Sequence, residues 1–129
     1  MNFKFNYSLL NHNSFSIDVK AKKFIEVKST EELKEVLSIS CDENKLIIGE
    51  GSNILFTKNF EGLVIHLNIG GIDINKIDND YRIVTAGAGE NWHDLVVYCL
   101  KNGLGGIENL SLIPGSVGAA PIQNIGAYG

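Results

Sequence analysis

Residues 113–129 read IPGSVGAAPIQNIGAYG, a run of small and uncharged side chains. This run closes a segment, 103–129, that holds seven of the 14 glycines, both prolines and a single charged residue, Glu108. A flexible linker would be rich in Ser, Lys and Glu, so the composition favours a segment whose backbone lies close to a partner. A flat or extended ligand could lie directly on these peptide groups, although a tightly packed structural loop would use the same residues.

Another glycine loop, Gly49-Glu50-Gly51-Ser52-Asn53, lies earlier in the chain and follows a short apolar run at 46–48. Its two glycines can adopt positive φ and turn consecutive amides inward as an anion-binding nest, with side-chain donors added by Ser52 and Asn53. A plain turn between two strands is the alternative interpretation. No third glycine completes a dinucleotide fingerprint here, and no Gly-Lys-Ser/Thr occurs. The 113–129 run has no cation nearby, so any phosphate bound there would be held by backbone amides and a short helix N-terminus.

The first half of the chain contains the signature of a βαβ unit. Ser29 and Glu32 form a capping box before a helix predicted over about 30–40. Apolar runs at 22–27 and 46–48 read as strands on either side of this helix. This order favours parallel strands joined by the helix.

The second half begins with a predicted hairpin and a second helix. The helix is expected over about 91–101 and ends at Gly103, with an apolar face made of Trp92, Leu95, Val96 and Cys99. Further strands are expected at 54–56, 63–67, 72–77 and 81–85, with a turn at 78–80 between the last two. The predicted fold class is α+β, with one mixed sheet and two helices.

Composition excludes several classes of protein. The 129 residues, 44% hydrophobic and 20% charged, fit one globular domain at most. The net charge of −4, with Lys and Arg scattered, argues against a nucleic-acid partner, and no apolar run or leader suggests a membrane or a secretory route. Cys41 and Cys99 are expected to be reduced, buried thiols of a cytosolic protein, and no spacing predicts a metal site.

Three motifs together resemble the UDP-N-acetylenolpyruvoylglucosamine reductase family: GEGSNILF at 49–56, GAGENWHDLV at 87–96 and IPGSVGAAPIQNIGAYG at 113–129. The resemblance covers about residues 15–129, and the segment 11–24 looks like the family's N-terminal stretch. It implies an FAD-binding domain of the vanillyl-alcohol-oxidase (PCMH) type in a bacterial cytoplasmic flavoprotein of peptidoglycan synthesis. Residues 1–129 would be the N-terminal part of that domain, incomplete at the C-terminus, and the substrate domain would be absent.

The resemblance also implies where FAD lies, which in the family is between two α+β lobes. The first loop would wrap the FAD pyrophosphate with Gly49, Glu50, Gly51, Ser52 and Asn53. The second would line the pyrophosphate and the isoalloxazine ring with Ile113, Pro114, Gly115, Ser116, Val117, Gly118 and Ala119. Ile122 and Gly126 would lie near the flavin, and Tyr128 would lie towards the substrate.

The family's reaction reduces UDP-N-acetylglucosamine enolpyruvate to UDP-N-acetylmuramate with hydride from NADPH, by way of FAD. The family's proton-donating serine and its glutamate and arginine partners lie downstream of the last motif, so no catalytic residue is matched here. The resemblance therefore implies the FAD-binding portion of an oxidoreductase acting on a CH–CH bond, inactive alone, with a C-terminal segment missing. Without FAD and that segment, residues 103–129 are expected to fray. A free-standing flavin- or nucleotide-binding module and a non-functional remnant stay open as alternatives.

Overall fold

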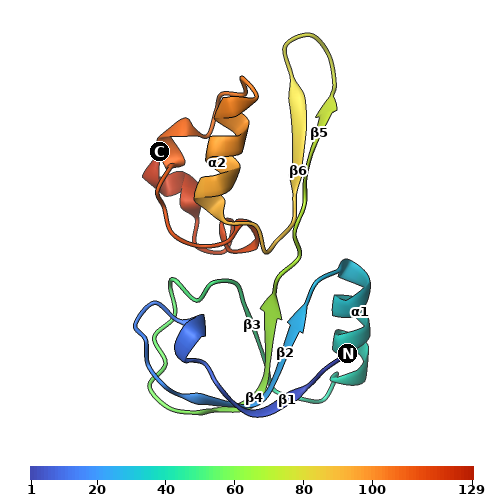
Figure 1. Cartoon of the computed structure of the whole chain (residues 1–129), viewed down its shortest axis with the longest axis vertical. Helices are drawn as coiled ribbons and strands as arrows, with labels where there is room; N and C mark the ends of the chain where they lie inside the picture. The colour runs from blue at the N-terminus through green and yellow to red at the C-terminus, as the bar shows by residue number, and fades with distance from the viewer.

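The computed structural model describes residues 1–129, which form two lobes stacked along the long axis of the molecule (Figure 1). The first lobe contains β1 (Lys4–Ser8), η1 (Leu10–His12), β2 (Lys20–Val27), α1 (Thr30–Ile39), β3 (Lys45–Ile48) and β4 (Phe60–Leu67). The second contains β5 (Ile72–Lys76), β6 (Arg82–Ala86), α2 (Trp92–Lys101), η2 (Glu108–Leu110), η3 (Val117–Ala119) and η4 (Ile125–Tyr128). Here η denotes a 3₁₀ helix. The α+β class is confirmed.

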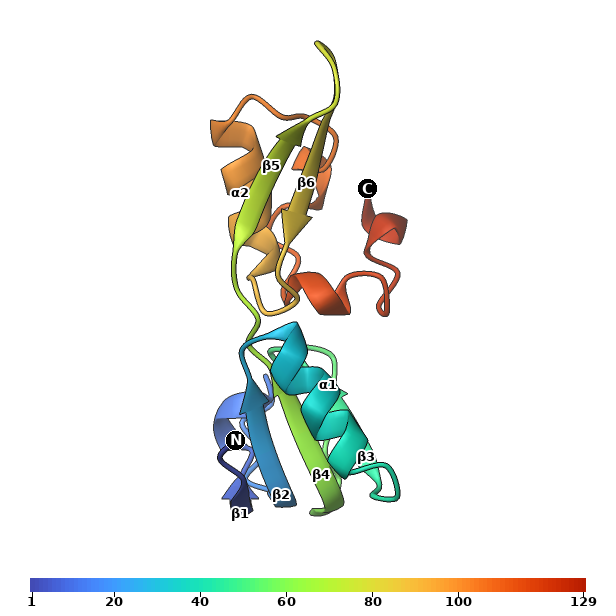
Figure 2. The same ribbon diagram turned by 90° about the vertical axis from the view of Figure 1, so that its right-hand side faces the viewer.

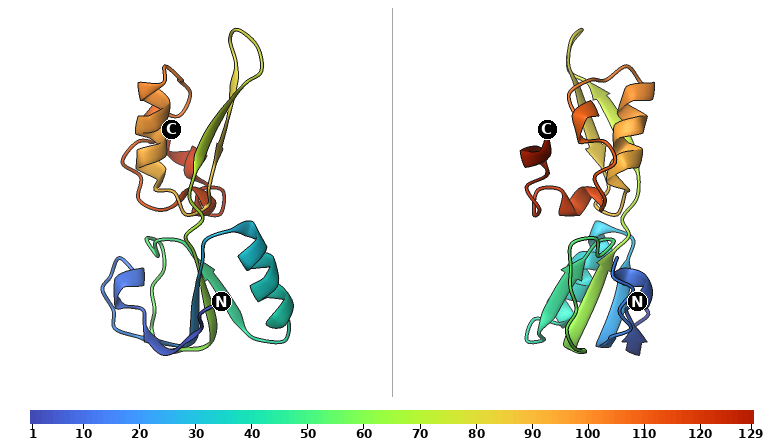
Figure 3. Two further views of the ribbon diagram at one scale, coloured as in Figure 1. Left: turned by 45° about the vertical axis from the view of Figure 1, so that its right-hand side comes forward. Right: turned by 90° about the vertical axis from the view of Figure 1, so that its left-hand side faces the viewer.

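The first lobe is built on a four-stranded sheet in the order β1-β2-β4-β3. Strands β2 and β3 both pair in parallel with β4, so the predicted βαβ unit is confirmed, with β4 inserted between its two strands. Helix α1 covers one face of this sheet (Figure 2), and η1 lies on the opposite side (Figure 3). The core under α1 consists of Ile25, Val27, Val36, Leu63 and Ile65. The core on the other face consists of Leu9, Val19, Ala21, Phe24, Ile48, Phe56 and Val64.

Both α-helices begin at side-chain caps, as expected of Ser and Asn at this position. The Ser29 hydroxyl accepts from the amide of Glu32 at 3.1 Å, and the Asn91 side-chain oxygen accepts from the amide of Asp94 at 3.1 Å. Helix α2 ends before Gly103, which has φ +68° and so terminates the helix as predicted. The apolar face predicted for α2 is buried throughout.

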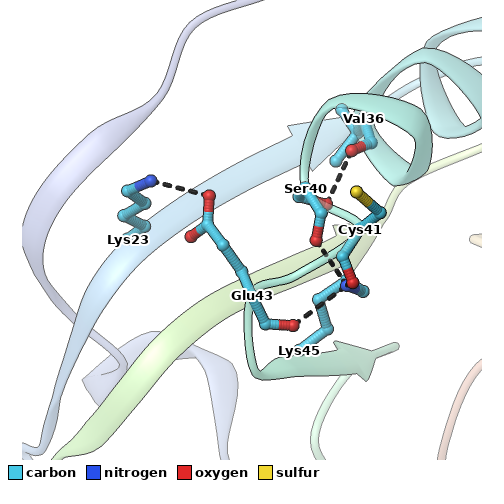
Figure 4. A network of polar contacts seen from close by, with 6 residues as sticks. All are labelled: Lys23, Val36, Ser40, Cys41, Glu43 and Lys45. Carbon is cyan, nitrogen blue, oxygen red and sulfur yellow. Dashed lines mark hydrogen bonds and ion pairs between the residues drawn. The ribbon is translucent and has the colours of Figure 1, made fainter.

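The turn between α1 and β3 is held by Lys45, the first residue of β3 (Figure 4). Its ammonium group donates to the main-chain carbonyls of Ser40, Cys41 and Glu43, at the negative end of the α1 dipole. The Glu43 carboxylate in turn lies 2.7 Å from the Lys23 ammonium on β2. These contacts fix where β3 starts, and therefore where its other end delivers the loop 49–53.

Three sequence-based predictions about the strands and thiols are wrong. Residues 54–56 form no strand: Ile54 and Phe56 pack on the core and Leu55 is exposed, but no neighbouring strand pairs with them. The sheet is not single, because β4 is flanked on both sides and leaves the β5–β6 hairpin no edge beside it to join. Cys41 is exposed rather than buried, since it lies in the turn after α1.

Strand β1 was not predicted, because its sequence KFNYS alternates poorly and four of its five residues are exposed. It is an edge strand, antiparallel to β2. Neither α-helix is long and apolar enough to cross a membrane.

Candidate functional site

A cleft of about 440 Å³ opens where the two lobes meet. This volume is within the range of about 300–1,000 Å³ typical of small-molecule sites. The first lobe contributes Ile47, Ile48, Gly49, Glu50, Gly51, Ser52, Asn53, Ile54 and Leu67. The second contributes Ser116, Gly118, Ala119, Ile122 and Gln123. The two glycine loops recognised in the sequence therefore face the same cavity.

The two glycines of the first loop are needed for different reasons. Gly51 has φ +69°, and a Cβ atom there would lie 2.0 Å from the main-chain oxygen of His12. Gly49 does not adopt positive φ, but a Cβ atom on it would lie 2.1 Å from the hydroxyl oxygen of Ser116. The expectation that both glycines turn amides inward through positive φ is therefore wrong for Gly49, which instead lets the two loops approach.

Unpaired amide groups are concentrated in the first loop. The amides of residues 50–53 donate to no acceptor within the chain. In contrast, the amides of Val117, Gly118 and Ala119 donate to the carbonyls of Glu90, Ala88 and Ser116 at 2.8, 2.9 and 3.0 Å. The N-terminus of η3 therefore has no free amides for a phosphate, and loop 49–53 has several. An anionic ligand in the cleft would find its donors on the first loop.

Ser116 supplies a second unsatisfied group. This residue is 2% exposed, it lines the cleft, and its hydroxyl oxygen has no hydrogen-bond partner in the chain. A buried polar group without a partner costs about 1–3 kcal/mol, and native structures rarely leave one so. The orphaned hydroxyl and the unpaired amides fit a ligand with polar oxygen atoms lying between the lobes.

The cleft contains one charged residue, Glu50. Its carboxylate accepts a hydrogen bond from the Asn91 side-chain amide at 2.9 Å and so is tied to the second lobe. No Lys, Arg or His lines the cavity, so an anion would be held by main-chain dipoles. Close by, the Ser52 hydroxyl donates to the carbonyl of Pro114 at 3.4 Å.

Not every residue that the resemblance assigned to FAD lies in the cleft. Ile113 and Val117 pack instead against the α2 cluster, and Pro114 is exposed beside the cavity. Gly115 has φ +121°, and a Cβ atom there would lie 2.9 Å from the hydroxyl oxygen of Ser52. Ile122 lines the cleft while 87% exposed. Gly126 and Tyr128 are exposed and lie outside the cavity.

Sequence reasoning missed the cleft residues Ile47, Ile48, Ile54, Leu67 and Gln123. Two of these end strands: Ile48 closes β3 and Leu67 closes β4. Ligands in sheets with parallel strands commonly bind beyond the carboxyl ends of those strands. The parallel βαβ pattern was therefore the signal that could have pointed to them.

The C-terminal segment has two apolar anchors. Ala120 and Ile125 are 4% and 8% exposed and pack in the α2 cluster with Trp92 and Leu95. The amide of Ile125 also donates to the carbonyl of Ala120 at 3.0 Å. Fraying of this segment in the absence of FAD stays a prediction.

A cluster of rings, made of His12, His66, Phe24 and Tyr7, lies next to the first loop. The His12 ring lies 4.8 Å from the His66 ring and 4.9 Å from that of Phe24, and its Nε2 atom is 3.3 Å from the Tyr7 hydroxyl. Burial, the neighbouring His66 and Lys4 together lower the pKa of His12, against the weaker opposing effect of Glu26. A Cβ atom on Gly51 would lie 2.0 Å from the main-chain oxygen of His12, so this cluster lies directly against the loop with the unpaired amides.

His93 has a structural role that the sequence did not reveal. Its Nδ1 atom accepts a hydrogen bond from the amide of Leu112 at 3.1 Å, which ties the start of α2 to the segment before the second loop. No group of three or more His, Cys, Asp or Glu side chains is placed to hold a metal ion.

The comparisons with known proteins agree with the cleft. An FAD binding domain family model matches residues 21–129. The chain is 52% identical over its whole length to a UDP-N-acetylenolpyruvoylglucosamine reductase of Flavobacterium johnsoniae, and 53% identical to that of Amoebophilus asiaticus. It covers 38% and 39% of those two proteins, so it spans about two-fifths of their length.

A crystal structure gives the same fold. The UDP-N-acetylenolpyruvylglucosamine reductase of Thermus caldophilus matches 92% of this chain with a TM-score of 0.63 and 24% identity. The match covers 40% of that protein. With a family model that matches from β2 to the last residue and a cleft whose unpaired donors suit a polar ligand, the chain belongs to the FAD-binding domain family.

Proposed function

We propose that this chain is the FAD-binding portion of a UDP-N-acetylenolpyruvoylglucosamine reductase of cell-wall synthesis. One observation carries the proposal: the unpaired amides of 50–53 and the orphaned Ser116 hydroxyl converge on one cleft between the lobes. The names of its relatives, which are about half identical to it, give the reaction class.

Different residues of the cleft would contact different parts of the cofactor. The amides of 50–53 would donate to the pyrophosphate, because they form a run of consecutive unpaired donors in this cavity. The Ser116 hydroxyl would donate to a cofactor oxygen, and Gly118 and Ala119 would leave room for the ring system. Bound FAD would supply the capacity to accept and deliver hydride. This chain's own residues would bind it and orient it.

The donor of hydride would be NADPH, and the substrate would be a UDP-sugar carrying an enolpyruvyl group. Neither finds a matched partner among the residues of this chain, so we place proton transfer to the substrate in the part of the longer relatives that the match does not cover. The chain alone is then expected to bind FAD without turnover.

Titration of the purified chain with FAD, followed by quenching of flavin fluorescence, tests the binding. FAD should bind far more tightly than FMN, which lacks the pyrophosphate that the 50–53 amides would hold. Equal affinity for FMN, or no binding of FAD, would overturn the proposal.

A chimaera tests the reaction. Fusing this chain to the remainder of the Flavobacterium johnsoniae relative should give NADPH oxidation that depends on the UDP-enolpyruvyl sugar, whereas the chain alone should give none. A fusion that folds and binds FAD but never consumes NADPH would instead favour a free-standing flavin-binding module.

A further inference from the structure

The two lobes are joined across the cleft by very few polar contacts. Between residues 1–67 and 72–129 the chain makes two hydrogen bonds. The Asn91 side-chain amide donates to the Glu50 carboxylate at 2.9 Å, and the Ser52 hydroxyl donates to the Pro114 carbonyl at 3.4 Å. Only the first has the length of an ordinary hydrogen bond, and its acceptor is charged.

Asn91 is joined to the second loop by main-chain contacts. Its side-chain oxygen caps α2, and its main chain forms an isolated antiparallel bridge with Ser116. The next residue, Trp92, donates its amide to the carbonyl of Gly115 at 2.9 Å. A displacement of Asn91 would therefore also displace Ser116, whose hydroxyl has no partner.

Glu50 belongs to the other set of cofactor donors. It lies in the loop whose amides at 50–53 are unpaired, one residue before Gly51, which has φ +69°. The Asn91–Glu50 bond thus fixes the distance between the two groups of donors that would hold the cofactor. The amide donor also compensates part of the negative charge of the Glu50 carboxylate, which lines the cleft.

We propose that Asn91 is a positioning residue that ties the two lobes across the cleft through Glu50 and so sets the spacing of the cofactor donors. The part of this inference that concerns FAD rests on the function proposed above. An asparagine suits the position because its oxygen caps the helix while its nitrogen donates to the other lobe. An aspartate would cap α2 equally well but would oppose the Glu50 carboxylate with a second one.

The chain carries its own probes for the separation of the lobes. Trp92, the only tryptophan, lies in the second lobe, and Cys41, the only exposed cysteine, lies in the first. With an acceptor dye on Cys41, energy transfer from Trp92 in the ligand-free chain reports the separation. Asn91→Asp should lower and broaden the transfer, measured against the unlabelled form of each variant. Adding Glu50→Gln should restore it, because the new amide can donate to the new carboxylate.

Asn75→Asp is the matched control. Asn75 donates its side-chain amide to the Asp73 carboxylate at 2.9 Å on the exposed β5, so the change opposes two carboxylates within one lobe. It should alter neither the transfer nor the binding of FAD.

The same variants are then titrated with FAD. Asn91→Asp should weaken binding by about tenfold, as expected for loss of one charged hydrogen bond, and the double variant should recover to within about threefold of the parent. If the parent chain fails to bind FAD, the proposed function is wrong, and energy transfer still decides the tie between the lobes. Unchanged transfer in Asn91→Asp, or a loss that Glu50→Gln does not rescue, would overturn the inference; altered transfer with unchanged FAD affinity would overturn its cofactor part.

Discussion

A Cβ atom on Gly49 would lie 2.1 Å from the hydroxyl oxygen of Ser116, although the two residues come from different lobes. The missing side chain at one position therefore makes room for the buried hydroxyl at the other. This hydroxyl has no partner in the chain, so the close approach places an unsatisfied donor on the wall of the cleft. The approach of these two residues is what brings the two glycine loops into one site.

Ser116→Ala should separate ligand binding from folding. Because the hydroxyl has no partner without ligand, its removal should leave the free energy of unfolding of the ligand-free chain unchanged or raised. FAD affinity should fall by about 1 kcal/mol, roughly fivefold. Urea unfolding and FAD titration measure the two effects.

Ser40→Ala is the comparison for this variant. Ser40 is also 2% exposed, but its hydroxyl donates to the Val36 carbonyl at 2.7 Å. Its loss should cost about 1 kcal/mol of stability with no change in FAD affinity. If Ser116→Ala destabilises the ligand-free chain as much as Ser40→Ala does, the hydroxyl is not a ligand donor.

Gly51→Ala should distort the backbone of the first loop, residues 49–53. The new side chain would be held at φ +69° and would meet the main-chain oxygen of His12. The left-handed conformation alone costs about 1–2 kcal/mol, and the clash adds to it. We expect FAD affinity to fall at least about tenfold. Gly103→Ala has nearly the same φ, +68°, with nothing within 4 Å, so it should lose stability while keeping FAD affinity. Equal effects of the two changes on binding would refute a special role for Gly51.

Stability should decline in mild acid because of His12. Burial, His66 and Lys4 lower its pKa below the usual 6.5, so the unfolded chain binds this proton more readily than the folded one. The stabilisation is complete above pH 6.5 and is lost as the pH falls through the lower, folded-state pKa. Urea midpoints of the parent should therefore drop more steeply below pH 6.5 than those of His12→Gln. Parallel pH profiles for the two proteins would contradict this assignment.

The two thiols should differ sharply in reactivity. Cys41 is exposed in the turn after α1, whereas Cys99 is 4% exposed and burial raises the pKa of its thiol. An aromatic disulfide reagent should modify one thiol in the native chain and the second only on unfolding. Mass mapping that finds Cys99 modified first in the native chain would show that the α2 cluster opens readily.

The sequence predicted best those features that are local. The capped helices, the Gly103 terminus and the buried face of α2 follow from residues three or four positions apart, and the structure confirms them. The separate β5–β6 sheet was missed, because it depends on β4 being already flanked by two other strands. The apparent strand at 54–56 shows the same limit: alternating burial is visible in the sequence, but the presence of a pairing strand is not.

In the candidate site, the two glycine loops were recognisable from the sequence, but which of them has unpaired amides was not. The amides of Val117 and Gly118 are paired with the carbonyls of Glu90 and Ala88, which lie alongside them at the bridge between Asn91 and Ser116. The cross-lobe bond from Asn91 to Glu50 joins residues 41 positions apart, and no spacing in the sequence indicates it.

The first lobe draws its whole sheet and both of its cores from residues before position 68. During synthesis, when the N-terminal units of a chain generally fold first, this lobe can close while residues 113–129 are still inside the ribosome. Half of the cofactor site would then exist as a preformed surface before the other half has emerged from the ribosome. Loading of the cofactor would become a late event in biogenesis, limited by when Ser116 leaves the exit tunnel.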